Sequence, residues 1–131
     1  MFIEDTIIFT MAFVFYAAAI GIHLLTLANV IPFTSINGGR SASFEAQAKQ
    51  SRASIVVLIL GGIVVLVGLL APNVRETIVY LIVVGLLALM WTAGTVLQLL
   101  GTRFERYVVV WINLLGAVSH IALALSYVGN V

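Results

Sequence analysis

The 131-residue chain is 63% hydrophobic and only 8% charged, and its mean hydropathy of +1.21 lies far outside the range of soluble domains. Its formal net charge of +1 gives no reason to expect a nucleic-acid partner, and the lack of cysteine excludes disulfides, thiolate catalysis and cysteine-bound metals. A chain of 14.1 kDa cannot bury this much apolar surface in a core of its own. The composition therefore predicts an integral membrane protein.

Four apolar stretches without Asp, Glu, Lys or Arg follow one another along the chain. Each has about the ~20 residues that a helix needs to cross a ~30 Å hydrocarbon core. A water-facing helix needs a charged face, and none of the four has one. They predict one all-α membrane domain, residues 1–131, with four transmembrane helices in an antiparallel up-down bundle whose short connections join neighbours. The predicted spans are 6–31, 53–71, 77–101 and 107–128.

Local signals predict where these helices begin and end. Pro32 follows the first span, at a place where helices usually stop. Ser43 is placed to cap a helix that starts at Phe44 and continues into the second span. Asn73 and Glu76 have the spacing of a capping box, which predicts that the third span starts there.

The basic residues predict the orientation in the membrane. Five of them lie in the connections after the first and third spans, whereas the other side carries only Arg75, together with Glu4 and Asp5. In short loops the side richer in Lys and Arg faces the cytoplasm. We therefore expect a multi-pass protein with both termini on the non-cytoplasmic side.

The same five basic residues allow three interpretations. They can serve the topology alone, or they can bind anionic lipid headgroups at roughly 1 kcal/mol per residue. Alternatively, those next to the second and fourth spans can hold an anionic ligand, because the guanidinium group binds such groups in a bidentate manner. The five residues are Arg40, Lys49, Arg52, Arg103 and Arg106.

Most polar residues of the spans fall in the halves expected to face the cytoplasm. Polar groups in hydrocarbon tend to face the bundle interior or a cavity. We therefore predict a polar cleft between the helices that opens toward the cytoplasmic leaflet. The alternative is a set of interhelical hydrogen bonds worth about 0.6 kcal/mol each. The candidate residues are His23, Thr26, Asn29, Thr95, Gln98, Asn113 and His120.

A pair of intramembrane histidines can ligate haem b, and His23 and His120 are the only two in the chain. Their depths argue against a shared haem. At 1.5 Å per residue they differ by roughly 10 Å along the bundle axis, whereas the two axial ligands of one upright haem lie at similar depth. We expect no haem or other cofactor and no metal.

Glycines seven residues apart stack on one face of a helix, as Gly61 and Gly68 do in the second span and Gly94 and Gly101 in the third. Small residues let helices in lipid approach closely. These four positions predict a packing seam within the bundle, with a self-association surface as the alternative.

No span carries an acid, a lysine or an arginine, and no nucleophile lies beside a general base. These absences favour a non-enzymatic role as an accessory or structural subunit of a larger respiratory or transport complex, in contact with lipid and with other subunits or copies of itself. The alternative is a homo-oligomeric channel or facilitator that uses the polar cleft. A third hypothesis is a small membrane transferase that binds an anionic cosubstrate at Arg52, Arg103 and Arg106.

Overall fold

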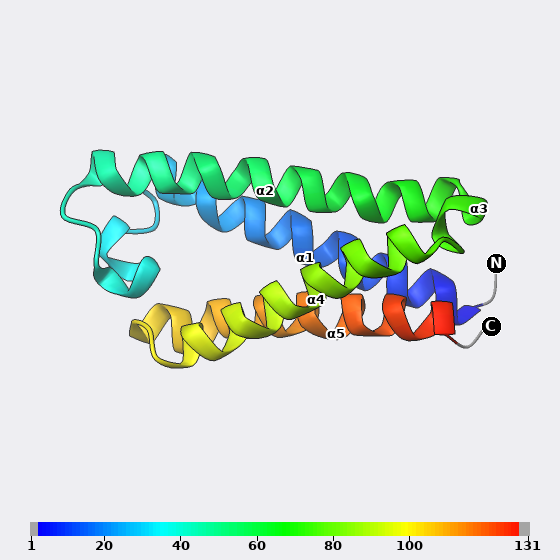
Figure 1. The fold of residues 1–131 in the computed structure, drawn as a ribbon. Helices are drawn as coiled ribbons and strands as arrows, with labels where there is room; N and C mark the ends of the chain where they lie inside the picture. Colours follow the sequence, from blue (N-terminus) through cyan, green and yellow to red (C-terminus); the bar gives the residue numbers. More distant parts are fainter. Residues whose placement is uncertain (1–2, 129–131) are drawn as a thin grey trace.

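A computed structural model describes residues 3–128, and this part of the chain is helical apart from its connections. The four long helices pack antiparallel, which confirms the predicted all-α, antiparallel arrangement (Figure 1). The elements in order are α1 (Ile3–Leu27), the short turns η1 (Phe33–Ser35) and η2 (Asn37–Gly39), α2 (Phe44–Leu70), α3 (Pro72–Arg75), α4 (Ile78–Leu99), the π-helical turn η3 (Glu105–Val109) and α5 (Val110–Val128), which continues directly from η3.

The exposed surfaces of the long helices show whether these helices suit water or lipid. In the most apolar window of each span, at most 39% of the residues are buried within the chain. Large side chains such as Leu70 and Leu100 expose 72% and 75% of their surface. Contiguous apolar surface of this extent is unfavourable in water and suits lipid. The four helices are long and apolar enough to cross a membrane, and the chain is a small multi-pass integral membrane protein.

Three helix pairs form the bundle. α1 packs against both α2 and α5, and α5 packs against α4 along its length. The fourth side of this ring is open, because α2 and α4 make few contacts although they follow one another in the chain. In Figure 1 α4 starts beside α2 at the α3 connection and crosses away from it toward the opposite end.

Two glycines of α2 lie directly against tyrosine rings of neighbouring helices. A Cβ atom at Gly61 would lie 2.8 Å from Cε1 of Tyr16 in α1, and one at Gly68 would lie 2.9 Å from Cε2 of Tyr80 in α4. Tyr80 therefore holds α4 against α2 near α3. Beyond this contact the two helices separate.

The glycines of α4 lie against the start of the last helix. A Cβ atom at Gly94 would lie 3.1 Å from the side-chain nitrogen of Asn113, and one at Gly101 would lie 2.9 Å from Cδ of Glu105. All four of the glycines singled out in the sequence thus contact side chains of the same chain.

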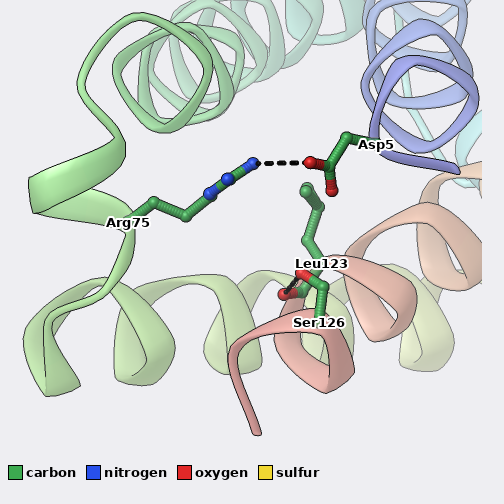
Figure 2. A network of polar contacts seen from close by, with 4 residues as sticks. All are labelled: Asp5, Arg75, Leu123 and Ser126. Atoms are coloured by element: carbon green, nitrogen blue, oxygen red, sulfur yellow. Dashed lines mark hydrogen bonds and ion pairs between the residues drawn. The ribbon is translucent and has the colours of Figure 1, made fainter. Parts of the chain in front are cut away.

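An ion pair ties α3 to α1 at the end of the bundle where both termini lie (Figures 1 and 2). Arg75 lies 3.6 Å from the Asp5 carboxylate, and its guanidinium carbon is 5.7 Å from the centre of the Phe9 ring. In α5 nearby, Ser126 donates a hydrogen bond to the carbonyl of Leu123 at 2.8 Å. The ion pair therefore joins α3 to α1 at this end, whereas α2 and α4 diverge toward the other end.

The first helix ends earlier than predicted. Asn29 has a φ of 58°, and its N–H bonds to the carbonyl of Thr26 at 3.1 Å while the N–H of Val30 bonds to that of Leu25 at 2.9 Å. This pair of bonds, with a left-handed residue between them, is a Schellman motif. The predicted extension to residue 31 is therefore wrong, because Asn29 ends the helix before Pro32 is reached.

One of the two predicted caps is confirmed. The Ser43 hydroxyl accepts a hydrogen bond from the N–H of Ala46 at 3.2 Å, and α2 begins at Phe44. The predicted capping box at Asn73 and Glu76 is wrong. Pro72 starts the separate one-turn helix α3, and α4 is capped by Thr77, whose hydroxyl accepts from the N–H of Tyr80 at 3.2 Å.

Candidate functional site

A cavity of about 660 Å³ lies between α2 and α4, at the end of the bundle away from α3. Small-molecule sites commonly measure about 300–1,000 Å³, so this volume suits a ligand. α1 and α5 contribute its inner wall, and the turn η2 closes the end near the loops. Its polar lining includes His23, Gln50, Ser54, Gln98, Glu105 and Asn113.

Polarity changes along the walls of the cavity. On α2 the lining passes from Gln50 and Ser54 near the loops to Val57 deeper in the bundle, and on α4 it passes from Gln98 to Met90. Val57 and Met90 line the cavity and still expose 44% and 39% of their surface. The cavity therefore has a polar end beside the loops and apolar walls that open sideways between α2 and α4.

A chain of hydrogen bonds joins α1, α2 and the loop behind the cavity. Ser41 donates to the Gln47 side chain at 2.5 Å, and Gln47 donates to the hydroxyl of Ser51 at 3.2 Å. The Ser51 hydroxyl can then donate to Nδ1 of His23, 3.2 Å away. In a neutral imidazole one ring nitrogen donates and the other accepts, so Nε2 of His23 is left for a second hydrogen bond.

Glu105 is a buried carboxylate that attaches the loop before α2 to the start of the last helix. Its two oxygens accept from the N–H of Gly38 at 3.1 and 3.0 Å, and Oε2 also accepts from the N–H of Thr102 at 2.8 Å. The Thr102 hydroxyl accepts from the N–H of Glu105 at 3.2 Å and donates to the carbonyl of Ser35. Gly38 has a φ of 64°, so it presents its N–H from a conformation that favours glycine.

Glu105 was missed by the sequence analysis, which assigned it no role. The signal was available, because Thr102 and Glu105 have the spacing of a capping box and form both of its reciprocal hydrogen bonds. Among residues 3–128 the one ion pair joins Asp5 and Arg75, so the charge of Glu105 is satisfied by backbone N–H groups alone.

Several polar groups of the cavity have no partner within the described part of the chain. The side-chain oxygen of Gln98 is buried and makes no hydrogen bond there. Asn113, which lies against Gly94, makes no side-chain hydrogen bond in that region either. The indole N–H of Trp91 is buried without an acceptor at hydrogen-bonding geometry, although its ring lies 6.1 Å from that of Tyr16. A buried polar group without a partner costs about 1–3 kcal/mol, which a bound ligand or water can recover.

His120 lies elsewhere and is fully buried between α1 and α5. Its Nδ1 donates to the carbonyl of Gly116 at 2.7 Å, so its Nε2 accepts from the Tyr16 hydroxyl at 2.9 Å. His23 and His120 thus have separate partners on different elements, and the structure does not bring them together.

The structure also separates the other predicted cleft residues. Thr26 and Thr95 donate to the carbonyls of Ile22 and Trp91 in their own helices, at 2.9 and 2.8 Å, and neither lines the cavity. Asn29 is exposed beyond the end of α1. Of the seven predicted residues, the lining contains His23, Gln98 and Asn113.

None of the five basic residues after the first and third spans lines the cavity. Arg40, Lys49, Arg52, Arg103 and Arg106 are all exposed on the surface at the loop end of the bundle. The three arginines proposed to bind an anionic cosubstrate, Arg52, Arg103 and Arg106, are thus not part of the lining.

No protein-family model, no curated protein and no solved structure matches this chain. The fold and the site define a small integral membrane protein of four antiparallel helices, with a ligand-sized cavity between α2 and α4. The function of the cavity is therefore inferred from the residues that line it.

Proposed function

We propose that this protein binds an amphipathic molecule inside the membrane and takes it up from the bilayer between α2 and α4. One observation carries the proposal: the cavity of about 660 Å³ is polar at one end and apolar along walls that face lipid. An amphipathic molecule has the same gradient. The contact of Tyr80 with Gly68 limits the opening on the side of α3, so the molecule enters beside Val57 and Met90.

The basic residues support an orientation for this uptake. All five exposed basic residues of the loops lie at the polar end of the cavity, and the single one at the other end, Arg75, is paired with Asp5. By the positive-inside rule the polar end belongs to the cytoplasmic leaflet, and the termini lie on the other side. The ligand therefore enters with its head at the cytoplasmic surface.

Cavity-filling substitutions test the proposal. Ala93 of α4 and Ala53 of α2 line the cavity and are exposed toward its opening, so Ala93→Phe and Ala53→Phe fill it without disturbing a buried seam. Ala17→Phe is the matched control, because Ala17 is exposed on α1 outside the lining. Two diazirine-bearing oleoyl lipids, one with a glycerol head and one with a phosphate head, serve as photoactivatable probes in nanodiscs.

The expected result is that at least one probe labels α2 and α4 in the parent and in Ala17→Phe, and that labelling falls about tenfold or more in both cavity variants. Equal labelling of the parent and the filled variants by both probes would overturn the proposal. Circular dichroism and thermal unfolding of each variant separate loss of binding from loss of fold.

A second candidate function, that of an accessory subunit in a larger membrane complex, is favoured by the outer face of α1. A Cβ atom at Gly21 would meet nothing within 4 Å, Ala17 is exposed one turn earlier on the same helix, and Ala28 is exposed in the turn that follows α1. Helices associate in lipid mainly through such small residues, and here none of them is used within the chain.

Gly21→Leu separates the two candidates. If α1 contacts another subunit, this variant loses proteins that copurify with the parent in mild detergent, while probe labelling of the cavity is unchanged. If the variant copurifies with the same partners as the parent, the α1 face is a lipid surface and the accessory role loses its support. The transferase hypothesis gains no support from the lining, which contains no arginine.

A further inference from the structure

We propose that the cavity selects amphipathic molecules with an uncharged hydrogen-bonding head, such as a hydroxyl or carbonyl group, and discriminates against anionic heads. This inference rests on the proposed binding function and specifies its ligand class. It follows from which charges and which free hydrogen-bonding groups line the polar end.

Among the described residues, no lysine or arginine lines the polar end. The basic residues nearest to it in the sequence, such as Lys49 and Arg52 beside Gln50, are exposed and do not belong to the lining. A buried anionic head needs a partner of opposite charge to offset the loss of its hydration. The cavity offers none.

Glu105, the one charged group among the lining residues, also disfavours an anionic head. Glu105 is buried at this end, so a second negative charge would meet a carboxylate where water screens little. Both of its oxygens already accept hydrogen bonds from Gly38 and Thr102. Glu105 therefore repels an anion and has little capacity left to bind a cationic head.

The free groups are neutral and include both donors and acceptors. Gln98 and Asn113 contribute side-chain amides without partners in the described chain, and Ser54 contributes a hydroxyl. His23 uses Nδ1 for its contact with Ser51, which leaves Nε2 for a second hydrogen bond. Amides and hydroxyls bind a hydroxyl or carbonyl head without a charge, and a hydroxyl head can also donate to the buried oxygen of Gln98.

Matched probes test the selectivity. The diazirine oleoyl lipid with a glycerol head labels the nanodisc-embedded protein, and unlabelled 1-oleoylglycerol or 1-oleoyl lysophosphatidate competes for the site. We expect 1-oleoylglycerol to compete at about tenfold lower concentration or better. Gln50→Arg introduces a cation into the lining and should shift the preference toward lysophosphatidate, whereas Lys49→Arg, on the exposed neighbour, should leave it unchanged.

The outcomes distinguish this inference from the function on which it rests. If the phosphate-headed probe labels the cavity as well as the glycerol-headed one, and Ala93→Phe blocks both, the binding function stands and the selectivity is refuted. If neither probe depends on Ala93, the binding function itself fails. A preference for 1-oleoylglycerol that Gln50→Arg reverses and Lys49→Arg does not supports both.

Discussion

The carboxylate of Glu105 binds the backbone N–H of Gly38, 67 residues earlier in the chain, with both of its oxygens at 3.1 and 3.0 Å. With the hydrogen bond from Thr102 to Ser35, this contact fixes the loop before α2 across the end of the bundle. The same loop places Asn37 at the cavity, where its amide donates to Gln50 at 2.6 Å. The shape of the polar end thus depends on one buried acid.

Glu105→Ala should release this loop. The substitution leaves the N–H groups of Gly38 and Thr102 without their acceptor, at a cost of about 1–3 kcal/mol each where they stay buried. We expect lower thermal stability and faster tryptic cleavage after the exposed Arg40. Glu105→Gln keeps one acceptor oxygen, so its thermal stability and cleavage rate should lie between those of the parent and those of Glu105→Ala. Glu45→Ala, at an exposed acid of α2, is the control. Cleavage at the parent rate in Glu105→Ala would contradict the role of this contact.

The contact of Tyr80 with Gly68 predicts a pair of coupled substitutions. Gly68→Ala places a methyl group against the Tyr80 ring and should cost about 1–3 kcal/mol by overpacking. Tyr80→Phe removes a buried hydroxyl that has no partner in the described chain, so alone it should be neutral or stabilising. Combined with Gly68→Ala it should restore part of the lost stability.

Gly85→Ala is the control for this pair, because a Cβ atom there meets nothing within 4 Å. Thermal unfolding in detergent measures all four variants. Additive effects of Gly68→Ala and Tyr80→Phe, with no recovery in the double variant, would show that α2 and α4 do not meet at these residues.

Tyr16→Phe should destabilise the contact between α1 and α5. The Nε2 atom of His120 then loses its donor in a fully buried position, at a cost on the order of 1 kcal/mol. Tyr107→Phe, at a tyrosine exposed by 75%, should leave stability unchanged. Equal unfolding temperatures for the two variants would mean that the hydrogen bond contributes nothing measurable to the bundle.

The orientation can be tested by cysteine labelling, because the chain contains no cysteine of its own. Ala42→Cys lies in the exposed loop before α2, and Asn73→Cys lies in the exposed connection at the other end. With five basic residues on the side of Ala42, a membrane-impermeant maleimide applied to intact cells should label only the cysteine at 73. Labelling of Ala42→Cys alone would reverse the orientation and place the polar end of the cavity outside.

The helices could be predicted from sequence because their signal is local: a run of about twenty uncharged, apolar residues is long enough to cross lipid as a helix, which satisfies all of its backbone hydrogen bonds internally. The end of α1 could not, since Asn29 adopts a left-handed conformation that glycine more often occupies. The cap of α4 was assigned to Asn73 because Asn73 and Glu76 have the spacing of a capping box, whereas Pro72 begins a separate one-turn helix at this place.

The candidate site was predicted in part. His23, Gln98 and Asn113 line the cavity because polar groups in lipid turn inward. The hydroxyls of Thr26 and Thr95 instead bond to their own helices, an outcome that spacing alone cannot distinguish. The opening between α2 and α4 depends on where Tyr80 contacts Gly68. This contact joins two helices, so it could not be predicted from the sequence of either helix alone.

The last prediction separates ligand binding from folding at the polar end. Gln98→Leu combined with Asn113→Leu removes two side chains that have no hydrogen-bond partner within residues 3–128, so no group of the protein is left unpaired. We expect the double variant to fold with parent stability or better, yet to lose labelling by the glycerol-headed probe about tenfold or more. Asn29→Gly is the control, because glycine adopts the same left-handed conformation outside the cavity and should change neither property. A double variant that folds and still binds the probe as the parent does would show that Gln98 and Asn113 do not recognise the head.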